Sequence, residues 1–151
     1  DLVPARVTLL GGSTTVVDSD APEGAVEVTG TPGPEVAAPT GPTSLVPIGR
    51  VVGTRSGDKG GNANLGVFVR SDEAWAWLDD FLTVERLRVL LPEAADLPID
   101  RYRLPAIRSL NFLIHGLLQE GVAASTRQDG QAKSLGEWLR ARHVEVPDAL
   151  L

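Results

Sequence analysis

Residues 55–66 read RSGDKGGNANLG, and this stretch decides how the central part of the chain divides into strands and loops. It contains four glycines, two asparagines, an aspartate and a lysine, with an apolar segment on each side. A tight hairpin turn needs only about two to five residues of this kind. We therefore expect a long glycine-rich loop between strands over residues 47–54 and 64–70.

The predicted loop carries groups that suit an anionic ligand. Gly57 and Gly60 permit positive φ, and consecutive amides in such a loop can surround an anion. Lys59 adds a cation, Asp58 can orient a hydroxyl, and Asn62 offers both donors and acceptors. The alternative is a long turn whose asparagines satisfy their own backbone. The stretch is neither a Walker loop nor a calcium loop, since a glycine follows the lysine and the closing glutamate is missing.

A second group of polar residues lies in SLNFLIHGLL, residues 109–118, where Asn111 and His115 interrupt an apolar segment. Residues 106–118 are long enough for a helix, although a strand remains open. A spacing of four places the two side chains on the same side of either element. His115 can act as a general acid or base near neutral pH, and the alternative is a structural histidine.

Arg127 lies in STRQDGQAKS, residues 125–134, and can bind a carboxylate or phosphate through two hydrogen bonds. A surface ion pair is the alternative. We expect a strand over residues 121–129 and a turn at Asp129 and Gly130.

The remaining elements follow from capping residues and apolar periodicity. Ser71 and Thr83 are predicted to cap two consecutive helices, and Ser134 with Glu137 forms a capping box for a third. Strands are predicted over residues 99–104 and 143–147. This mixed order predicts an α+β fold, with one sheet that carries helices on one face.

The acidic character of the chain, with a net charge of −6, is concentrated in its front part. Residues 1–47 hold six acidic side chains against one arginine, whereas the rest is almost balanced. Neither part has the basic surplus that binds nucleic acid. Residues 6–17 read as a hairpin, and we expect residues 1–17 to be the tail of a preceding domain. Residues 18–46 read as a Pro/Gly-rich linker, and the compact domain is predicted over residues 47–151.

The residue types that the chain lacks argue against several kinds of functional site. The chain has no cysteine and only two histidines, so we expect no disulfide, no metal site and no cofactor. It begins at Asp1 and has no methionine, and we therefore expect a fragment of a longer protein. No apolar segment is as long as a membrane span, so we expect no membrane partner. The absence of cysteine fits a reducing cytoplasm, where we expect the protein to be located.

Three stretches together resemble one protein family. SGDKGGNANLGV, RYRLPAIRSLNFLIHGLL and GVAASTRQDGQAKSLGEWL, followed by VEVP, are similar in order and spacing to the C-terminal ferredoxin-like domain of acyclic terpene utilisation (AtuA-like) proteins. The resemblance implies a ferredoxin-like sandwich. It also implies a cytoplasmic role in citronellol- or geraniol-type terpenoid catabolism through acyl-CoA intermediates. The implied partners are an N-terminal AtuA-like domain or subunit, an acyl-CoA ligand and further copies of the chain in a homo-oligomer.

We therefore predict an accessory domain acting on acyl-CoA or branched-acid intermediates, with its site residues in one common hollow. The alternatives are a non-catalytic assembly module and a stand-alone domain that binds an anionic small molecule. The predicted catalytic residues are His115 and Asp58, and the predicted ligand-binding residues are Ser56, Gly57, Lys59, Gly60, Asn62, Asn111 and Arg127.

Overall fold

The structure is a computed structural model that describes residues 5–17, 32–33 and 35–151. The chain divides into two compact units, residues 1–30 and 31–151. In the first unit, β1 (Ala5–Thr8) pairs antiparallel with β2 (Thr14–Val17), which is the predicted hairpin. Most of the predicted linker, residues 18–31 and 34, lies outside the described residues.

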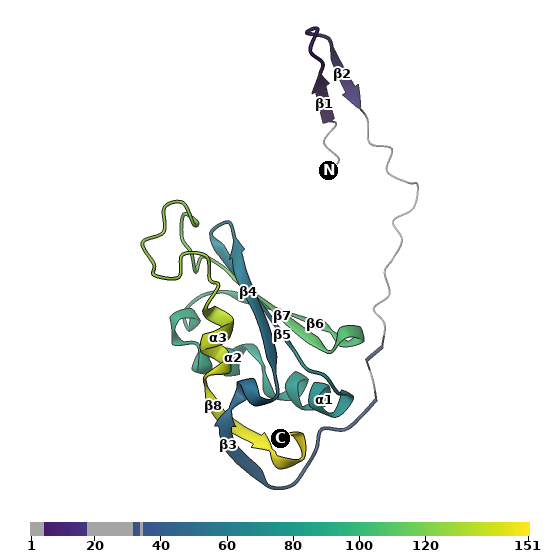
Figure 1. The fold of residues 1–151 in the computed structure, drawn as a ribbon, viewed down its shortest axis with the longest axis vertical. Helices are drawn as coiled ribbons and strands as arrows, with labels where there is room; N and C mark the ends of the chain where they lie inside the picture. The colour runs from purple at the N-terminus through teal and green to yellow at the C-terminus, as the bar shows by residue number, and fades with distance from the viewer. Residues whose placement is uncertain (1–4, 18–31, 34) are drawn as a thin grey trace. The chain divides into compact units, whose positions relative to one another are not determined.

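The described residues of the second unit form six strands and three α-helices (Figure 1). The four-stranded sheet has the order β4-β5-β7-β6, while β3 and β8 form a separate pair, and every pairing is antiparallel. An α+β fold is thus confirmed, with its strands divided between two sheets. The elements are β3 (Thr43–Pro47), β4 (Gly53–Lys59), β5 (Asn62–Phe68), α1 (Asp72–Phe81), α2 (Val84–Leu90), β6 (Ile99–Leu104), β7 (Ser109–Ile114), α3 (Leu135–Arg140) and β8 (His143–Pro147).

One face of the four-stranded sheet forms the hydrophobic core. Leu65 in β5 pairs with Phe112 in β7, and both side chains are fully buried. Successive side chains of a strand point to opposite faces, so the register assigns every paired residue to a face. Ser56 pairs with Leu65, and Arg101 pairs with Phe112, so both belong to the core face.

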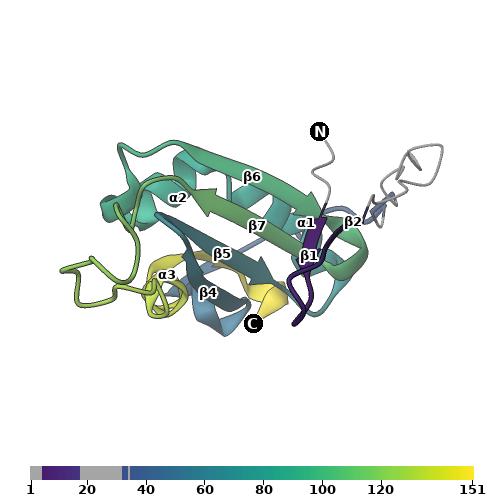
Figure 2. The same ribbon diagram turned by 90° about the horizontal axis from the view of Figure 1, so that it is seen from above.

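All three helices cover this core face, and Figure 2 shows the sheet from a second direction. Asp79 of α1 binds Arg101 of β6, and Gly136 of α3 lies against Ser56 of β4. The predicted caps of the first two helices are confirmed, because Ser71 and Thr83 each accept a hydrogen bond from the helix they begin. We call the opposite side, over which no helix of the described residues lies, the open face.

The elements predicted over residues 106–118 and 121–129 are wrong. Residues 106–118 do not form a helix, because Leu110, Phe112 and Ile114 are buried at every second position of strand β7. Residues 121–129 do not form a strand but a series of turns. Hydrogen bonds that nearby amides donate to the side chains of Ser125 and Asp129 compete with strand pairing there.

The capping box of the third helix is also wrong. Ser134 adopts a helical conformation and its side chain makes no capping hydrogen bond. The Asp129 carboxylate instead accepts hydrogen bonds from the amides of Lys133 and Ser134. The single strand predicted over 47–54 is interrupted, because Pro47 ends β3, a 3-10 turn spans Ile48–Arg50, and β4 begins at Gly53. β3 itself begins at Thr43, within the predicted linker.

Candidate functional site

The stretch 55–66 is a tight hairpin and not a long loop. Its polar residues belong to β4 and β5, which pair residue by residue from Gly53–Phe68 to Lys59–Asn62. Only Gly60 and Gly61 form the turn, and Gly60 has a φ of 60°, which hairpin turns of two residues require. Because Gly53–Lys59 is an extended strand, whose successive amides point in opposite directions, the predicted cradle of consecutive amides is wrong.

Gly61 leaves room for a second loop, which packs against the turn. A Cβ at Gly61 would lie 2.2 Å from the carbonyl oxygen of Gln119, so only glycine fits there. The amide of Leu118 donates to the carbonyl of Gly61 at 2.9 Å, and the amide of Gly116 donates to Oδ1 of Asn62 at 2.9 Å. The residues after β7 are therefore fastened to the hairpin tip.

The register separates the predicted site residues into two groups. Ser56 and Asp58 lie on the core face, because Asp58 pairs with the buried Ala63. Ser56 has a structural role there, since its Oγ donates to the carbonyl of Lys133 at 3.2 Å and accepts from the amide of Gly136 at 3.0 Å. It also lines a cavity of about 230 Å³ together with Lys133.

The other group lies on the open face of the sheet. Gly57 and Lys59 alternate with the core-facing residues of β4, and Asn62 and Asn111 do so in β5 and β7. His115 follows β7 and reaches the same face through its contact with Asp100. Asp58 thus lies across the sheet from Asn111 and His115, and these three side chains do not meet in one hollow.

His115 has a carboxylate partner that the sequence analysis missed. Its Nε2 lies 2.8 Å from Oδ2 of Asp100, and Tyr102 donates a longer hydrogen bond of 3.4 Å to the same oxygen. A carboxylate only accepts, so Nε2 carries the hydrogen and Nδ1 is the basic nitrogen of neutral His115. The sequence gives only an indirect signal of this contact. Asp100 and Tyr102 alternate with Arg101 and Arg103, so in a strand they lie together on one face.

Arg127 is not joined to the open-face residues. Its amide donates to Oγ of Ser125, and its buried Nε has no hydrogen-bond partner in the part of the chain that the structure describes. Lys59 donates to the backbone carbonyl of Asp58 at 3.1 Å. Neither cation forms an ion pair with another described residue.

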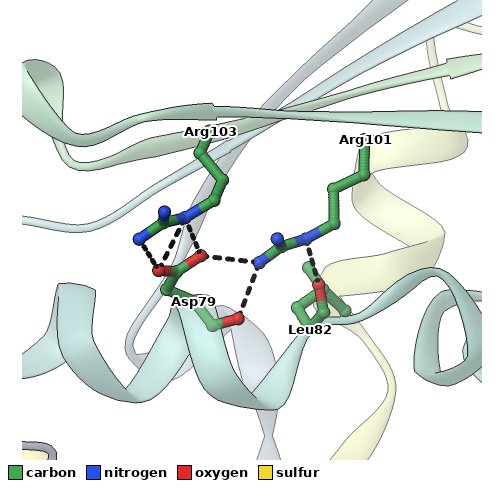
Figure 3. Close-up of polar contacts among 4 residues, drawn as sticks. All are labelled: Asp79, Leu82, Arg101 and Arg103. Atoms are coloured by element: carbon green, nitrogen blue, oxygen red, sulfur yellow. Dashed lines mark hydrogen bonds and ion pairs between the residues drawn. The ribbon is translucent and has the colours of Figure 1, made fainter. Parts of the chain in front are cut away.

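A second missed feature is a network of charged side chains between α1 and β6 (Figure 3). The Asp79 carboxylate accepts hydrogen bonds from Nη2 of Arg101 at 2.8 Å and from Nη2 of Arg103 at 2.5 Å. Arg101 also donates to the carbonyl of Leu82 at 3.0 Å. Burial alone would raise the pKa of Asp79, but hydrogen bonds from Arg103 and Arg101 outweigh it and hold the pKa of this carboxyl below its usual range. These contacts fix α1 against the sheet.

None of the described helices is both long and apolar enough to span a bilayer. Within residues 5–17, 32–33 and 35–151, no three His, Asp or Glu side chains gather closely enough to hold a metal ion.

Comparison with known proteins identifies the family. The model of the family described as "AtuA ferredoxin-like domain" matches residues 46–145, about two thirds of the chain. No curated protein and no solved structure matches the chain. The matched range contains β4 to β7, α1 to α3 and every predicted site residue. The chain therefore belongs to the AtuA ferredoxin-like domain family.

Proposed function

We propose that this domain is an accessory part of a larger AtuA-like protein of acyclic terpenoid catabolism. Its ligands would be acyl-CoA or branched-acid intermediates of the citronellol or geraniol type, in the cytoplasm. The family match supports a context of this kind. The observation that carries the proposal is the open face, on which five of the nine predicted site residues lie: Gly57, Lys59, Asn62, Asn111 and His115.

The open face has the chemistry to bind a polar ligand. Asn111 is half-buried, and no hydrogen bond from its side chain to another described residue is present. A carboxamide in this position gains a partner when a ligand's carbonyl or carboxylate approaches. Gly66 pairs with Asn111 in the register. Because Gly66 has no side chain, a ligand can approach the strand backbone closely beside Asn111.

His115 is the proposed proton-transfer group on this face. Asp100 orients the imidazole ring, so that Nδ1 is the nitrogen that would accept a proton from a bound substrate. The side chain is 37% exposed, which leaves it accessible to a ligand. Asp58 is not proposed to act with it, since the sheet lies between them.

Ligand binding by this chain tests the proposal. Isothermal titration with isovaleryl-CoA is expected to detect binding, and Asn111→Leu is expected to weaken it about three- to tenfold, because one hydrogen bond is lost. Asp58→Asn is the matched control, since it changes a polar residue on the core face and leaves the open face intact. Equal affinities of the wild type and Asn111→Leu, or a loss of affinity confined to Asp58→Asn, would contradict the proposal.

A second candidate function, an assembly module, is favoured by the apolar residues on the same face. Phe68, Tyr102 and Leu104 are 38%, 49% and 42% exposed. A second copy fits as the occupant because the charges complement each other. A two-fold axis parallel to the strands places β4 of one copy over β6 of the other. Asp100 of one copy then lies opposite Gly57 of the other, between Arg55 and Lys59.

Light scattering with a charge exchange tests the assembly function. If the open face joins two copies, Arg55→Asp and Asp100→Arg each convert dimers into monomers by placing like charges opposite each other. The double variant restores the dimer, since the ion pair re-forms with its charges exchanged. A wild-type chain that is monomeric at high concentration, or a double variant that stays monomeric, rejects this function.

A further inference from the structure

A separate cavity lies at the end of the β4–β5 hairpin that is opposite to the Gly60–Gly61 turn. It has a volume of about 400 Å³, within the size range of small-molecule sites. Three arginines from three distant parts of the sequence line it: Arg50 ends a 3-10 turn, Arg70 follows β5, and Arg140 ends α3. The other lining residues are small or mostly apolar: Gly49, Val51, Val52, Gly53, Thr54 and Phe68.

The cavity has a positive charge that the described residues do not balance. No acidic side chain among the residues that the structure describes lines it. Glu137 binds Nη1 of Arg140 at 2.9 Å, but Nε of Arg140 is buried without a hydrogen-bond partner among the described residues. Arg50 and Arg70 are exposed, and neither takes part in an ion pair within the described ranges. Three guanidinium groups around one cavity repel each other unless an anion lies between them.

The position of Arg140 depends on a glycine. A Cβ at Gly49 would lie 2.9 Å from Cβ and 3.1 Å from Nε of Arg140. Only a residue without a side chain at position 49 therefore lets Arg140 lie against the 3-10 turn that carries Arg50. A second cavity of about 330 Å³ adjoins the first, because both are lined by Arg50, Val51 and Arg70, and this one also contains Glu73.

We propose that the arginine cavity binds the phosphate groups of an organic phosphate. Guanidinium groups match phosphate oxygens through paired hydrogen bonds, and three of them suit a ligand with more than one negative charge. The apolar side chains of Val51 and Phe68 form a wall for the organic part of the ligand. Under the proposed function this ligand is the diphosphate end of an acyl-CoA; that identification rests on the proposed function, whereas the phosphate site does not.

Titration calorimetry with three probes tests the phosphate site: coenzyme A, dephospho-coenzyme A and inorganic pyrophosphate. Arg50→Gln and Arg70→Gln are each expected to weaken binding of coenzyme A about tenfold or more, because each removes a charge-assisted contact. Arg142→Gln is the matched control. It removes the same charge from an exposed arginine that does not line the cavity, and it is expected to change the affinity less than twofold. Thermal unfolding checks that the variants fold.

The outcomes separate the two proposals. Weakening by Arg50→Gln and Arg70→Gln but not by Arg142→Gln supports the site. Binding of pyrophosphate without binding of coenzyme A supports a phosphate site and rejects acyl-CoA as the ligand. Binding of coenzyme A that these two substitutions leave unchanged, while Asn111→Leu weakens it, overturns the arginine site and preserves the proposed function. Absence of binding by all three probes, or equal weakening by Arg142→Gln, also overturns the site.

Discussion

Replacing Asp79 with asparagine is expected to lower the free energy of unfolding by about 2–4 kcal/mol at neutral pH. The carboxylate is the common partner of Arg101 and Arg103, and its side chain is only 15% exposed. Arg101 is 19% exposed and keeps only backbone acceptors when the charge of Asp79 is removed. Chemical denaturation of the wild type and Asp79→Asn measures the difference.

Asp80→Asn is the matched control, because Asp80 is the next residue of the same helix and is exposed. It is expected to change the stability by less than about 0.5 kcal/mol. A similar loss in both variants would mean that general charge on α1, and not the arginine network, sets the stability.

The contribution of Asp79 is also expected to depend on pH. Its pKa in the folded protein lies below the usual range, whereas the unfolded chain has the ordinary value of about 3.9. The stabilisation is therefore complete above the unfolded value, and it is lost as the pH falls through the folded value. The difference between the wild type and Asp79→Asn should be constant from about pH 7 to pH 5 and shrink below about pH 4. A constant difference down to about pH 2.5 would contradict the shift.

Local signals made part of the fold predictable. The caps at Ser71 and Thr83 depend on residues three positions away, and both were correct. The helix predicted over 106–118 failed because Leu113 fits a helical stripe as well as a strand, and only pairing with β5 and β6 decides between them. The capping box failed because Asp129 accepts the hydrogen bond from the Ser134 amide that the Glu137 side chain was predicted to accept.

The candidate sites were less predictable, since they join residues that are distant in sequence. Asp79 and Arg103 are 24 residues apart, and nothing in the helix pattern distinguishes Asp79 from an ordinary surface acid. The arginine cavity combines residues 50, 70 and 140, which no motif connects. By contrast, Asn111 and His115 could be placed on one side together, because a spacing of four gives that result in a strand or a helix.

The second large effect on stability is expected at Gly61, in the turn of the β4–β5 hairpin. Gly61→Ala is expected to destabilise the protein by about 1–3 kcal/mol, because its Cβ would lie 2.2 Å from the backbone oxygen of Gln119, where no flexible side chain can move aside. The loop after β7 has to shift, and the hydrogen bond from Leu118 to Gly61 is strained. Thermal and chemical unfolding measure the loss, and hydrogen exchange at the Leu118 amide is expected to increase.

Gly60→Asn distinguishes this crowding from the demands of the turn itself. Position 60 has a positive φ, which asparagine tolerates, and no atom lies within 4 Å of a Cβ placed there. Gly60→Asn is therefore expected to lower the free energy of unfolding by less than about 1 kcal/mol and to leave hydrogen exchange at the Leu118 amide unchanged. If Gly60→Asn were the more harmful change, backbone conformation would explain the two glycines. If Gly61→Ala is more harmful, glycine is present at position 61 because the loop after β7 needs the space. Since that loop begins directly after His115, Gly61→Ala is also expected to shift the His115 ring resonances, whereas Gly60→Asn is not.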